Sequence, residues 1–190
     1  MTVKPKLIIL VASTRPGRVG STVGQWFARL ADEHGAYDVE LVELEDMKLP
    51  LFNEPHHPAM VKYVHEHTKN WSAKVAGADA FVFVTPEYNF GTPPSLTNAL
   101  TYLVNEWKYK PVGFASYGGI SGGIRSVQDT KLALTTFNMV PMYEAVVIPN
   151  VGGELDDNGT FVAKEIHDQS ANTMLDELLR WTNALASLRN

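Results

Sequence analysis

The sequence predicts an α/β fold in which one doubly wound sheet of five parallel strands carries helices on both faces. Two apolar runs, residues 7–12 and 80–84, contain no polar alternation, as is typical of parallel strands buried on both faces. Segments with strand character alternate with segments of helical periodicity, which indicates βαβ units. No repeat, low-complexity tract or linker divides the chain, so residues 1–190 are expected to form one domain.

The first three strands are expected at residues 7–12, 39–44 and 80–84. The second contains Glu40 and Glu43, and such charges are typical of a strand at the edge of a sheet. The helix after the first strand has an apolar face formed by Val23, Trp26, Phe27 and Leu30. A helix from residue 61 to residue 75 is expected on the spacing of Val61, Val64, Thr68, Trp71 and Val75.

The last two strands are expected at residues 111–116 and 143–148. Glu144 marks the fifth strand as the second edge. The strand order 2-1-3-4-5, a common order of doubly wound sheets, is expected because it places both charged strands at the edges. A helix after the central strand is expected on Leu96, Ala99, Leu100 and Leu103. Another helix is expected at about residues 124–138.

The C-terminal part of the chain predicts a hairpin and a final helix. Residues 151–161 contain a Gly-Gly pair and an Asn-Gly pair, whose turn chemistry closes hairpins. The final helix is expected on the spacing of Met174, Leu175, Leu178, Trp181, Leu185 and Leu188. Trp26, Trp71 and Trp181 are expected in the core, whereas Trp107 fits either the core or a subunit interface.

The composition narrows the possible functions. A formal net charge of −5 argues against nucleic acid as the main partner, because binding to phosphate backbones requires a basic face. No apolar stretch approaches the ~20 residues that span a bilayer, and the run at residues 7–12 is too short for a signal peptide, so no membrane partner and a cytoplasmic location are expected. The chain contains no cysteine, which excludes disulfides and a catalytic thiol, and any redox role must come from a bound cofactor.

A metal site is not expected. His56, His57, His65 and His67 cluster in the sequence, but helical ligand pairs are normally four residues apart. His65 and His67 are two apart, so their side chains are expected to diverge around the helix. A solvated helix face is the favoured interpretation of this cluster.

The loop after the first strand is a candidate phosphate site. Ser13, Thr14, Ser21 and Thr22 supply short hydroxyl groups, Gly17 and Gly20 allow close backbone approach, and Arg15 and Arg18 add positive charge. The helix that follows offers free N–H groups and the positive end of its dipole. Capping of that helix by Ser or Thr is the alternative interpretation, but capping does not explain two arginines. Neither G-x-G-x-x-G nor G-x-x-x-x-G-K-[ST] occurs here, which disfavours a Rossmann dinucleotide site and a P-loop.

Two further loops are expected at the same edge of the sheet, since ligands of open α/β sheets bind beyond the carboxyl ends of the strands. Residues 85–94 contain three prolines, two aromatic residues, a carboxylate and an amide, and they form a loop longer than an ordinary βα connection. This loop is interpreted as a wall for a flat ligand. The fourth strand ends in Ser116-Tyr117-Gly118-Gly119, whose glycines are expected to expose N–H groups to the same ligand.

Three segments of the sequence resemble those of a known family. They are Ser13-Thr14-Arg15, Thr85-Pro86-Glu87-Tyr88-Asn89-Phe90-Gly91 with Leu96-Thr97-Asn98-Ala99, and Ser116-Tyr117-Gly118-Gly119. Over roughly residues 6–150 the chain resembles the NADPH-dependent FMN reductase family, and within it the small quinone-reductase branch that includes azo-dye and chromate reductases. The resemblance implies a flavodoxin-like three-layer fold, bound FMN, and a homodimer or homotetramer. It also implies two half-reactions, in which NAD(P)H reduces FMN and a small electron acceptor then replaces the spent coenzyme.

The resemblance also implies roles for individual residues. The FMN phosphate is assigned to Ser13, Arg15, Gly20, Ser21 and Thr22, with Thr14 and Arg18 as further candidates in the same loop. The isoalloxazine ring is assigned to Pro86, Glu87, Tyr88, Asn89 and Phe90. Its pyrimidine side is assigned to Ser116, Tyr117, Gly118 and Gly119. No side chain is assigned as catalytic, because flavin N5 carries the hydride.

Some alternatives stay open. A flavodoxin-type electron carrier without NAD(P)H turnover is the nearest rival, although such carriers use a phosphate loop without arginine. Two further alternatives are a flavin-binding regulatory or scaffold protein and a reductase that releases reduced FMN. Thr97 and Thr101 stand where relatives carry lysine and aspartate, so the subunit contacts are expected to differ if those positions take part in them.

Overall fold

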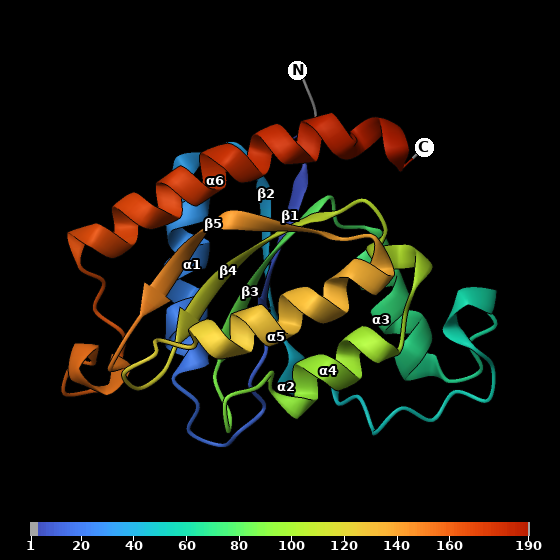
Figure 1. The fold of residues 1–190 in the computed structure, drawn as a ribbon, viewed down its shortest axis with the longest axis horizontal. Helices are drawn as coiled ribbons and strands as arrows, with labels where there is room; N and C mark the ends of the chain where they lie inside the picture. Colours follow the sequence, from blue (N-terminus) through green and yellow to red (C-terminus); the bar gives the residue numbers. More distant parts are fainter. Residues whose placement is uncertain (1–3, 190) are drawn as a thin grey trace.

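The computed structural model describes residues 4–189, and in this part of the chain five strands form one parallel sheet (Figure 1). The strand order is β2-β1-β3-β4-β5, as the sequence predicts. The strands are β1 (Lys6–Val11), β2 (Asp38–Glu43), β3 (Ala80–Pro86), β4 (Pro111–Tyr117) and β5 (Val140–Ile148).

Helices cover both faces of the sheet, which gives three layers. One face packs against α1 (Gly20–His34) and α6 (Glu165–Leu185). The other packs against α3 (Glu66–Ala76), α4 (Pro94–Thr101) and α5 (Ile124–Leu134). A short helix, α2 (Leu44–Met47), follows β2, and 3₁₀ turns lie at Pro58–Met60, Asn105–Trp107, Thr135–Phe137, Val151–Glu154 and Ala186–Leu188.

Two apolar cores lie on opposite sides of the sheet, and alternate residues of each central strand enter different cores. In β1, Leu7 and Ile9 pack on the side of α1 and α6, whereas Ile8 and Leu10 pack on the side of α3 and α4. All residues of β3 and β4 are buried. A strand covered on both faces has no polar side, which explains the unbroken apolar runs in the sequence.

The edge strands carry the charges that the sequence placed there. β2 is only partly buried along most of its length, and in β5 Tyr143 is 92% exposed. β5 begins at Val140, three residues before the predicted start, because its first residues pair with Pro111 and Val112 of β4. In the predicted hairpin segment, residues 151–154 form a 3₁₀ turn, and only residues 155–161 form a minimal hairpin, closed by a single antiparallel bridge between Leu155 and Phe161.

The predicted helix over residues 61–75 is wrong in its first turn, since α3 begins at Glu66. The Glu54 carboxylate accepts hydrogen bonds from the N–H groups of Val64 (2.8 Å) and His65 (3.0 Å), so His65 remains extended as the residue before the helix. Val61 has a positive φ of 52°. A carboxylate ten residues away along the chain therefore determines where this helix starts.

The tryptophans follow the predictions except at one position. Trp26 and Trp71 are buried, and Trp107 also lies in the core, where its Nε1 donates to the carbonyl oxygen of Leu100. Trp181, predicted in the core, is 44% exposed. The buried positions near the end of α6 are Leu178 and Thr182, which are four residues apart on one helix face, and Trp181 points away from that face.

The carboxyl ends of the strands all meet at one edge of the molecule. The loops after β1, β3 and β4 lie together at the bottom of Figure 1, and both ends of the described chain lie at the opposite edge. Within residues 4–189, no helix combines the length and the hydrophobicity that crossing a membrane requires.

Candidate functional site

The loop between β1 and α1 is hydrogen-bonded to the loop after β3. The buried Ser13 hydroxyl and the Tyr88 hydroxyl form a hydrogen bond of 2.6 Å, although the two residues are 75 positions apart. The backbone N–H of Arg15 also donates to Ser13 Oγ, over 3.3 Å. On the next helix, Ser95 donates its hydroxyl to the carbonyl oxygen of Ala12 over 2.5 Å. The β1 and β3 loops therefore form a single connected surface.

The first turn of α1 is open to an anion. Its N-cap residue, Val19, makes no side-chain cap, and no acidic residue lies in the first turn. Thr22 donates its hydroxyl to the carbonyl oxygen of Val19, so it does not cap the helix N–H groups either. Gly20 is required by packing, because a Cβ there would lie 2.5 Å from the Tyr117 hydroxyl. The capping interpretation is therefore not observed, and the helix N-terminus retains donors for a phosphate.

The two arginines of this loop have different surroundings. The Arg18 guanidinium pairs with Glu43 at the end of β2, with Nε 2.9 Å from Oε2, and Ser21 donates to the same oxygen over 3.0 Å. Arg15 is exposed and forms no ion pair with another residue in 4–189. The charge of Arg18 is thus already compensated within the protein, whereas the charge of Arg15 is available to a ligand.

The β3–α4 loop contains a two-residue turn. Tyr88 and Gly91 exchange two backbone hydrogen bonds, of 3.2 and 2.9 Å, around Asn89 and Phe90. Both central residues have positive φ, 50° and 70°, which is the type I′ pattern. Asn tolerates this region, but a side chain such as that of Phe90 costs about 1–2 kcal/mol there. Strain of this kind persists where the surroundings hold it and is frequent at ligand sites.

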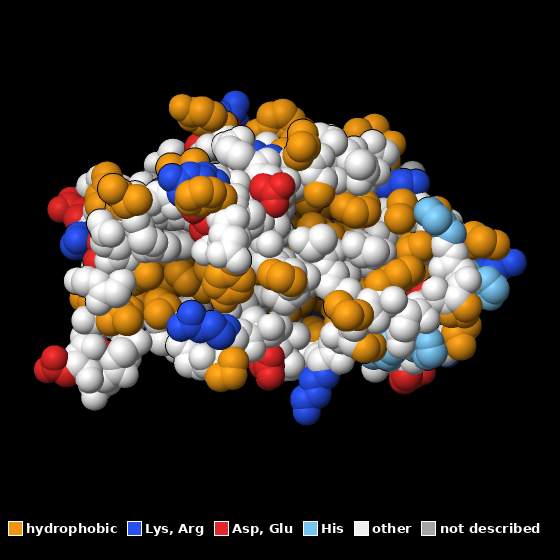
Figure 2. Space-filling model, turned by 60° about the horizontal axis from the view of Figure 1, so that its bottom comes forward, with side chains coloured by type: hydrophobic (Ala, Val, Ile, Leu, Met, Phe, Trp, Pro, Cys, Tyr) orange, Lys and Arg blue, Asp and Glu red, His pale blue; other side chains and the backbone are white. Residues whose placement is uncertain are grey.

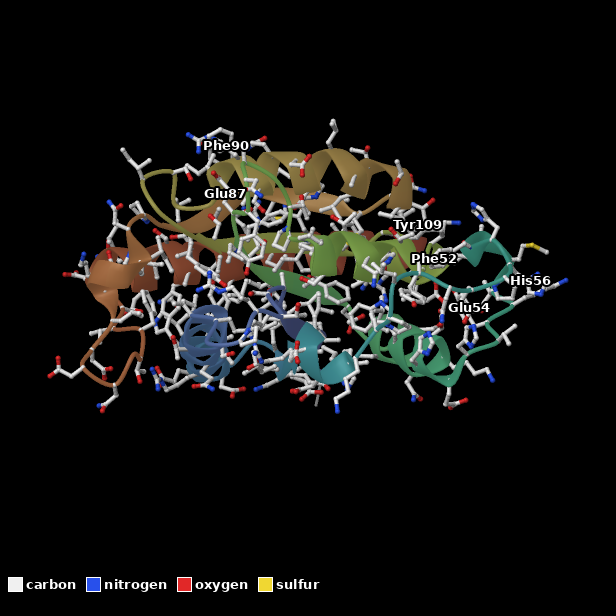
Figure 3. The ribbon with its side chains drawn as sticks, turned by 90° about the horizontal axis from the view of Figure 1, so that it is seen from below. Phe52, Glu54, His56, Glu87, Phe90 and Tyr109 are labelled. Atoms are coloured by element: carbon white, nitrogen blue, oxygen red, sulfur yellow. The ribbon has the colours of Figure 1, made fainter. Side chains whose placement is uncertain are left out.

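The carboxylate of this loop is used inside the protein. The Glu87 side chain, 9% exposed, accepts from Arg125 and from the Ser121 hydroxyl at the start of α5 (Figure 3). Burial alone raises a carboxyl pKa, but the hydrogen bonds from Arg125 and Ser121 outweigh it and hold the pKa of Glu87 below its usual range. Glu87 is therefore an anion that anchors the loop.

The β4–α5 loop is partly closed by its own backbone. The Gly118 N–H donates to the carbonyl oxygen of Ile148 over 3.2 Å, so it is not free for a ligand, in contrast to the expectation from the sequence. Beside Gly119 there is open space. Ser116 is buried, and its hydroxyl has no hydrogen-bond partner among the described residues. Burial raises the pKa of Tyr117, so this residue keeps its proton at neutral pH.

A cavity of about 240 Å³ adjoins the first loop, between α2 and α4. Its wall is mostly apolar and is formed by Leu44, Leu49, Leu51 and Pro94. The polar residues that line it are Thr14, Ser95 and Asn98. Asn98 also holds the segment at residues 50–52, because its side-chain NH₂ group donates to the carbonyl oxygen of Pro50 and its Oδ1 accepts from the N–H of Phe52. Larger hollows, of about 510 and 630 Å³, lie away from the three loops, at the other end of the strands and beside α1.

All three predicted loops thus lie at one edge, on neighbouring strands (Figure 1). Figure 2 turns this edge toward the viewer, and hydrophobic side chains are spread over the face that it shows. Sequence reasoning missed Glu43, Arg125 and Asp129, which hold these loops, because their partners are 25 to 38 residues away in the chain. No local motif gives such pairs.

The histidines lie away from these loops. His65 precedes α3 instead of lying inside it, so its ring stacks on that of His67, with centroids 5.1 Å apart. The expectation that the two rings diverge around a helix is therefore wrong. His67 binds the amide oxygen of Asn53 over 3.1 Å, if that ring nitrogen carries the proton.

The fold and the arrangement of loops define a flavodoxin-like α/β protein whose candidate ligand site lies across the ends of β1, β3 and β4. Solved structures share this architecture. A flavoenzyme NAD(P)H:acceptor oxidoreductase from Paracoccus denitrificans superposes with a TM-score of 0.74 at 20% identity, over 95% of this chain and 98% of that one. A Streptococcus pneumoniae flavodoxin superposes with a TM-score of 0.57 at 14% identity, over 92% and 97%. The predicted flavodoxin-like, three-layer fold is confirmed.

The sequence itself gives the family. A model of the family described as NADPH-dependent FMN reductase matches residues 5–153, more than half of the chain. An NAD(P)H-dependent FMN reductase of Schizosaccharomyces pombe is 38% identical over 152 residues, which cover 78% of this chain and 76% of that protein. A 2-hydroxy-1,4-benzoquinone reductase of a Burkholderia species is 25% identical over 188 residues, covering 93% and 95%. The chain belongs to the NADPH-dependent FMN reductase family, and the predicted class, an oxidoreductase that uses FMN and NAD(P)H, is confirmed at the level of the family.

Proposed function

We propose that this protein is an FMN-dependent NAD(P)H oxidoreductase that reduces quinone-like acceptors. The observation that carries the proposal is the convergence of three loops from neighbouring strands, one beside an uncapped helix N-terminus with a free arginine. FMN, when bound, would supply hydride-transfer chemistry at its ring N5 between NAD(P)H and the acceptor. The chain supplies binding, orientation and electrostatics.

The phosphate end of FMN fits the β1–α1 loop. The open first turn of α1 supplies N–H donors and a positive dipole end, and the exposed guanidinium of Arg15 supplies charge. Ser13, Thr14, Gly20, Ser21 and Thr22 line the same loop. The Ser13 hydroxyl is bonded to Tyr88, so a phosphate that takes this hydroxyl as a donor changes the contact between the two loops.

The ring end fits the space between the β3–α4 and β4–α5 loops. The N–H groups of Asn89 and Phe90 at the tip of the turn make no hydrogen bond to another residue in 4–189, so two donors remain for a flat polar edge. The unpartnered Ser116 hydroxyl and the open side of Gly119 lie on the neighbouring strand end. Donors placed there stabilise the electron density that the ring gains on reduction.

No side chain is assigned as acid, base or nucleophile. The polar side chains at this edge are held by partners of their own: Glu87 by Arg125 and Ser121, and Arg18 by Glu43. The role of the chain is therefore to bring coenzyme or acceptor against the ring in the right orientation.

The acceptor is proposed from the curated relatives. Besides the Burkholderia enzyme, a quinone reductase of Pseudomonas putida is 29% identical over 137 residues. Quinones are therefore the proposed acceptors, with azo dyes, chromate and free flavin as further candidates, and with either NADPH or NADH as donor. The 240 Å³ cavity beside Thr14 gives the site an apolar extension toward α4.

We also propose that the protein forms a homodimer or a homotetramer. Apolar side chains gather on the segment before α3, where Leu51, Met60, Val61 and Val64 are each at least half exposed. A surface of this kind is typical of subunit interfaces. Sedimentation velocity is the measurement, and a protein that stays monomeric at all concentrations up to about 100 µM contradicts this part of the proposal.

Steady-state oxidation of NADPH with menadione tests the reaction. The purified, flavin-loaded protein is expected to oxidise NADPH at a rate that saturates with menadione. NADPH and menadione are expected to bind in turn, in a ping-pong mechanism, which gives parallel double-reciprocal plots. Binding of FMN without turnover contradicts the proposal and favours an electron carrier or a regulatory protein. Loss of flavin from the protein during turnover instead indicates a reductase that releases reduced FMN.

A further inference from the structure

Two residues of α5 hold the β3–α4 loop at its two ends. Arg125 donates from its backbone N–H to Glu87 Oε2 over 3.1 Å and from Nη1 to Glu87 Oε1 over 2.8 Å. Asp129 accepts the N–H and the hydroxyl of Thr92 on Oδ2, each over 2.8 Å. Residues four apart share one face of a helix, so a single rigid element makes both contacts.

The charges of this arrangement are matched. Hydrogen bonds from Arg125 and Ser121 keep the pKa of Glu87 low despite its burial, and those from Thr92 lower the pKa of Asp129. Both carboxylates are therefore ionised at neutral pH. Charge-assisted hydrogen bonds are the stronger kind, which suits an anchor.

Between these two anchors lies the strained turn. Asn89 and Phe90 both have positive φ, a conformation that a residue such as Phe adopts only when its surroundings impose it. The Arg125 guanidinium lies over the Phe90 ring, 4.2 Å from the ring centroid, and the ring is otherwise 70% exposed. Figure 3 shows Glu87 and Phe90 beside the start of α5. The ring thus packs outward on Arg125, while the N–H groups of the turn remain free.

We propose that Arg125 and Asp129 are positioning residues that together form a clamp on the Asn89-Phe90 turn. The clamp holds the turn in its strained conformation, so that its two free N–H groups are preorganised for the flavin ring. The inference rests on the proposed function, because it assigns these N–H groups to FMN. A turn that is fixed before binding does not have to be ordered by the ligand, and such preorganisation strengthens binding. Neither side chain needs to touch the cofactor.

The first test is FMN titration of the full chain after removal of its flavin, followed by flavin fluorescence. Arg125→Ala is expected to weaken FMN binding about tenfold, which corresponds to about 1.4 kcal/mol. The matched control is Arg180→Ala, which removes an exposed arginine paired with Glu177 on α6 and is expected to leave the affinity unchanged. Arg125→Lys keeps a cation near Glu87 but loses the flat guanidinium over Phe90, and it is expected to fall between Arg125→Ala and the unmodified protein.

A rescue experiment separates positioning from general stability. Asn-Gly is the preferred sequence for a two-residue type I′ turn, so the turn no longer needs the clamp when Phe90→Gly is added to Arg125→Ala. The double variant is expected to bind FMN at least about fivefold more tightly than Arg125→Ala alone, an order-of-magnitude figure from the strain at this position. If Arg125 acted only through overall stability, the added substitution would not restore FMN affinity.

Hydrogen exchange tests the clamp without any cofactor. The N–H groups of Gly91 and Thr92 donate to Tyr88 and Asp129, and both are expected to exchange several-fold faster in Arg125→Ala and in Asp129→Ala than in the unmodified protein. The inference is overturned if both variants exchange these N–H groups at the wild-type rate, or if Arg125→Ala binds FMN with wild-type affinity. It is also overturned if the double variant binds FMN as weakly as Arg125→Ala alone. Failure of the unmodified protein to bind FMN contradicts the proposed function instead, while the exchange rates still test the clamp.

Discussion

At the carboxyl end of β1, two arginines three residues apart differ in what they can offer a ligand. Arg18 is held by Glu43, which also accepts from Ser21, whereas the guanidinium of Arg15 is exposed and pairs with no described carboxylate. An arginine already neutralised by a carboxylate adds less to anion binding than a free one. Phosphate recognition is therefore expected to depend mainly on Arg15, and Arg18 is expected to stabilise the loop.

The first prediction concerns this difference. Arg15→Ala is expected to weaken FMN binding about tenfold, at the low end for a charge-assisted hydrogen bond because the side chain is solvated. Riboflavin lacks the phosphate, so its affinity is expected to stay the same in this variant. Titration of both flavins gives the selectivity directly. Equal losses for FMN and riboflavin, or a larger loss in Arg18→Ala than in Arg15→Ala, contradict the assignment.

At this scale the sequence predicts which loops carry the polar residues but not what those residues contact. Strand ends and turn residues are local features, so the loops at residues 13–22, 85–94 and 116–119 follow from the sequence. Arg18 appears free in the sequence because Glu43 lies on another strand. The Gly118 N–H appears free as well, although it pairs with Ile148. Contacts of this kind arise only when the sheet is assembled.

The side chain of Met174 on α6 packs directly against the backbone of β4 at Gly113. A Cβ on Gly113 would lie 2.5 Å from Met174 Sδ and 3.1 Å from its Cγ. Packing of a long helix across the sheet therefore depends on a glycine in a central strand, where glycine is otherwise unfavourable.

A second prediction follows from this contact. Gly113→Ala is expected to lower the free energy of unfolding by about 1–3 kcal/mol, the usual cost of overpacking a core. Gly119→Ala is the control for stability, because a Cβ there meets no atom within 4 Å, and it is expected to change stability by less than about 0.5 kcal/mol. Urea unfolding measures both, and equal stabilities for the two variants contradict the packing argument.

A third prediction concerns the end of α3. Lys110, 5% exposed, donates from Nζ to the carbonyl oxygens of Val75 (2.6 Å) and Ala76 (3.1 Å), so it caps the C-terminus of this helix. Burial, together with the nearby Arg189, lowers the pKa of Lys110 to about 8. The unfolded chain has the ordinary lysine pKa of about 10.4, so between pH 8 and 10.4 the unfolded state binds more protons than the native state.

Stability is therefore expected to rise with pH across this window, by up to about 3 kcal/mol at 1.36 kcal/mol per unit of pKa shift. Urea unfolding at about pH 7.5, 9 and 10 measures the rise, and Lys110→Met is expected to remove it. A rise of the same size in Lys110→Met assigns the effect to other groups and contradicts this account.

Among the elements, apolar patterns predict the existence and type of an element better than its boundaries. Unbroken apolar runs placed β1 and β3, and the helical spacing of apolar residues placed α1, α4 and α6. It failed at the start of α3, where the Glu54 carboxylate takes the N–H groups of Val64 and His65. It also failed for Trp181, since an aromatic residue next to the buried face of a helix matches the pattern as well as one on it.

For the whole molecule, the charge pattern of the strands indicates which two lie at the edges of the sheet, because a strand at an edge can carry Glu40 or Glu144 with access to water. Charge does not order the three inner strands, whose predicted order is that of a common doubly wound sheet. The order in turn brings the ends of β1, β3 and β4 side by side, although their loops are far apart in the chain. The path of the segment between α2 and α3, which shapes the cavity beside Thr14, has no such periodic pattern and did not follow from the sequence.

The three strand ends of β1, β3 and β4 are proposed to form one site that holds FMN while NADPH reduces it. The visible spectrum of the purified, FMN-loaded protein, recorded anaerobically before and after addition of NADPH, tests this proposal. The flavin absorption bands are expected to stay with the protein on gel filtration and to bleach when NADPH is added. A protein that does not retain FMN, or one whose flavin bands persist in the presence of excess NADPH and NADH, contradicts the proposal.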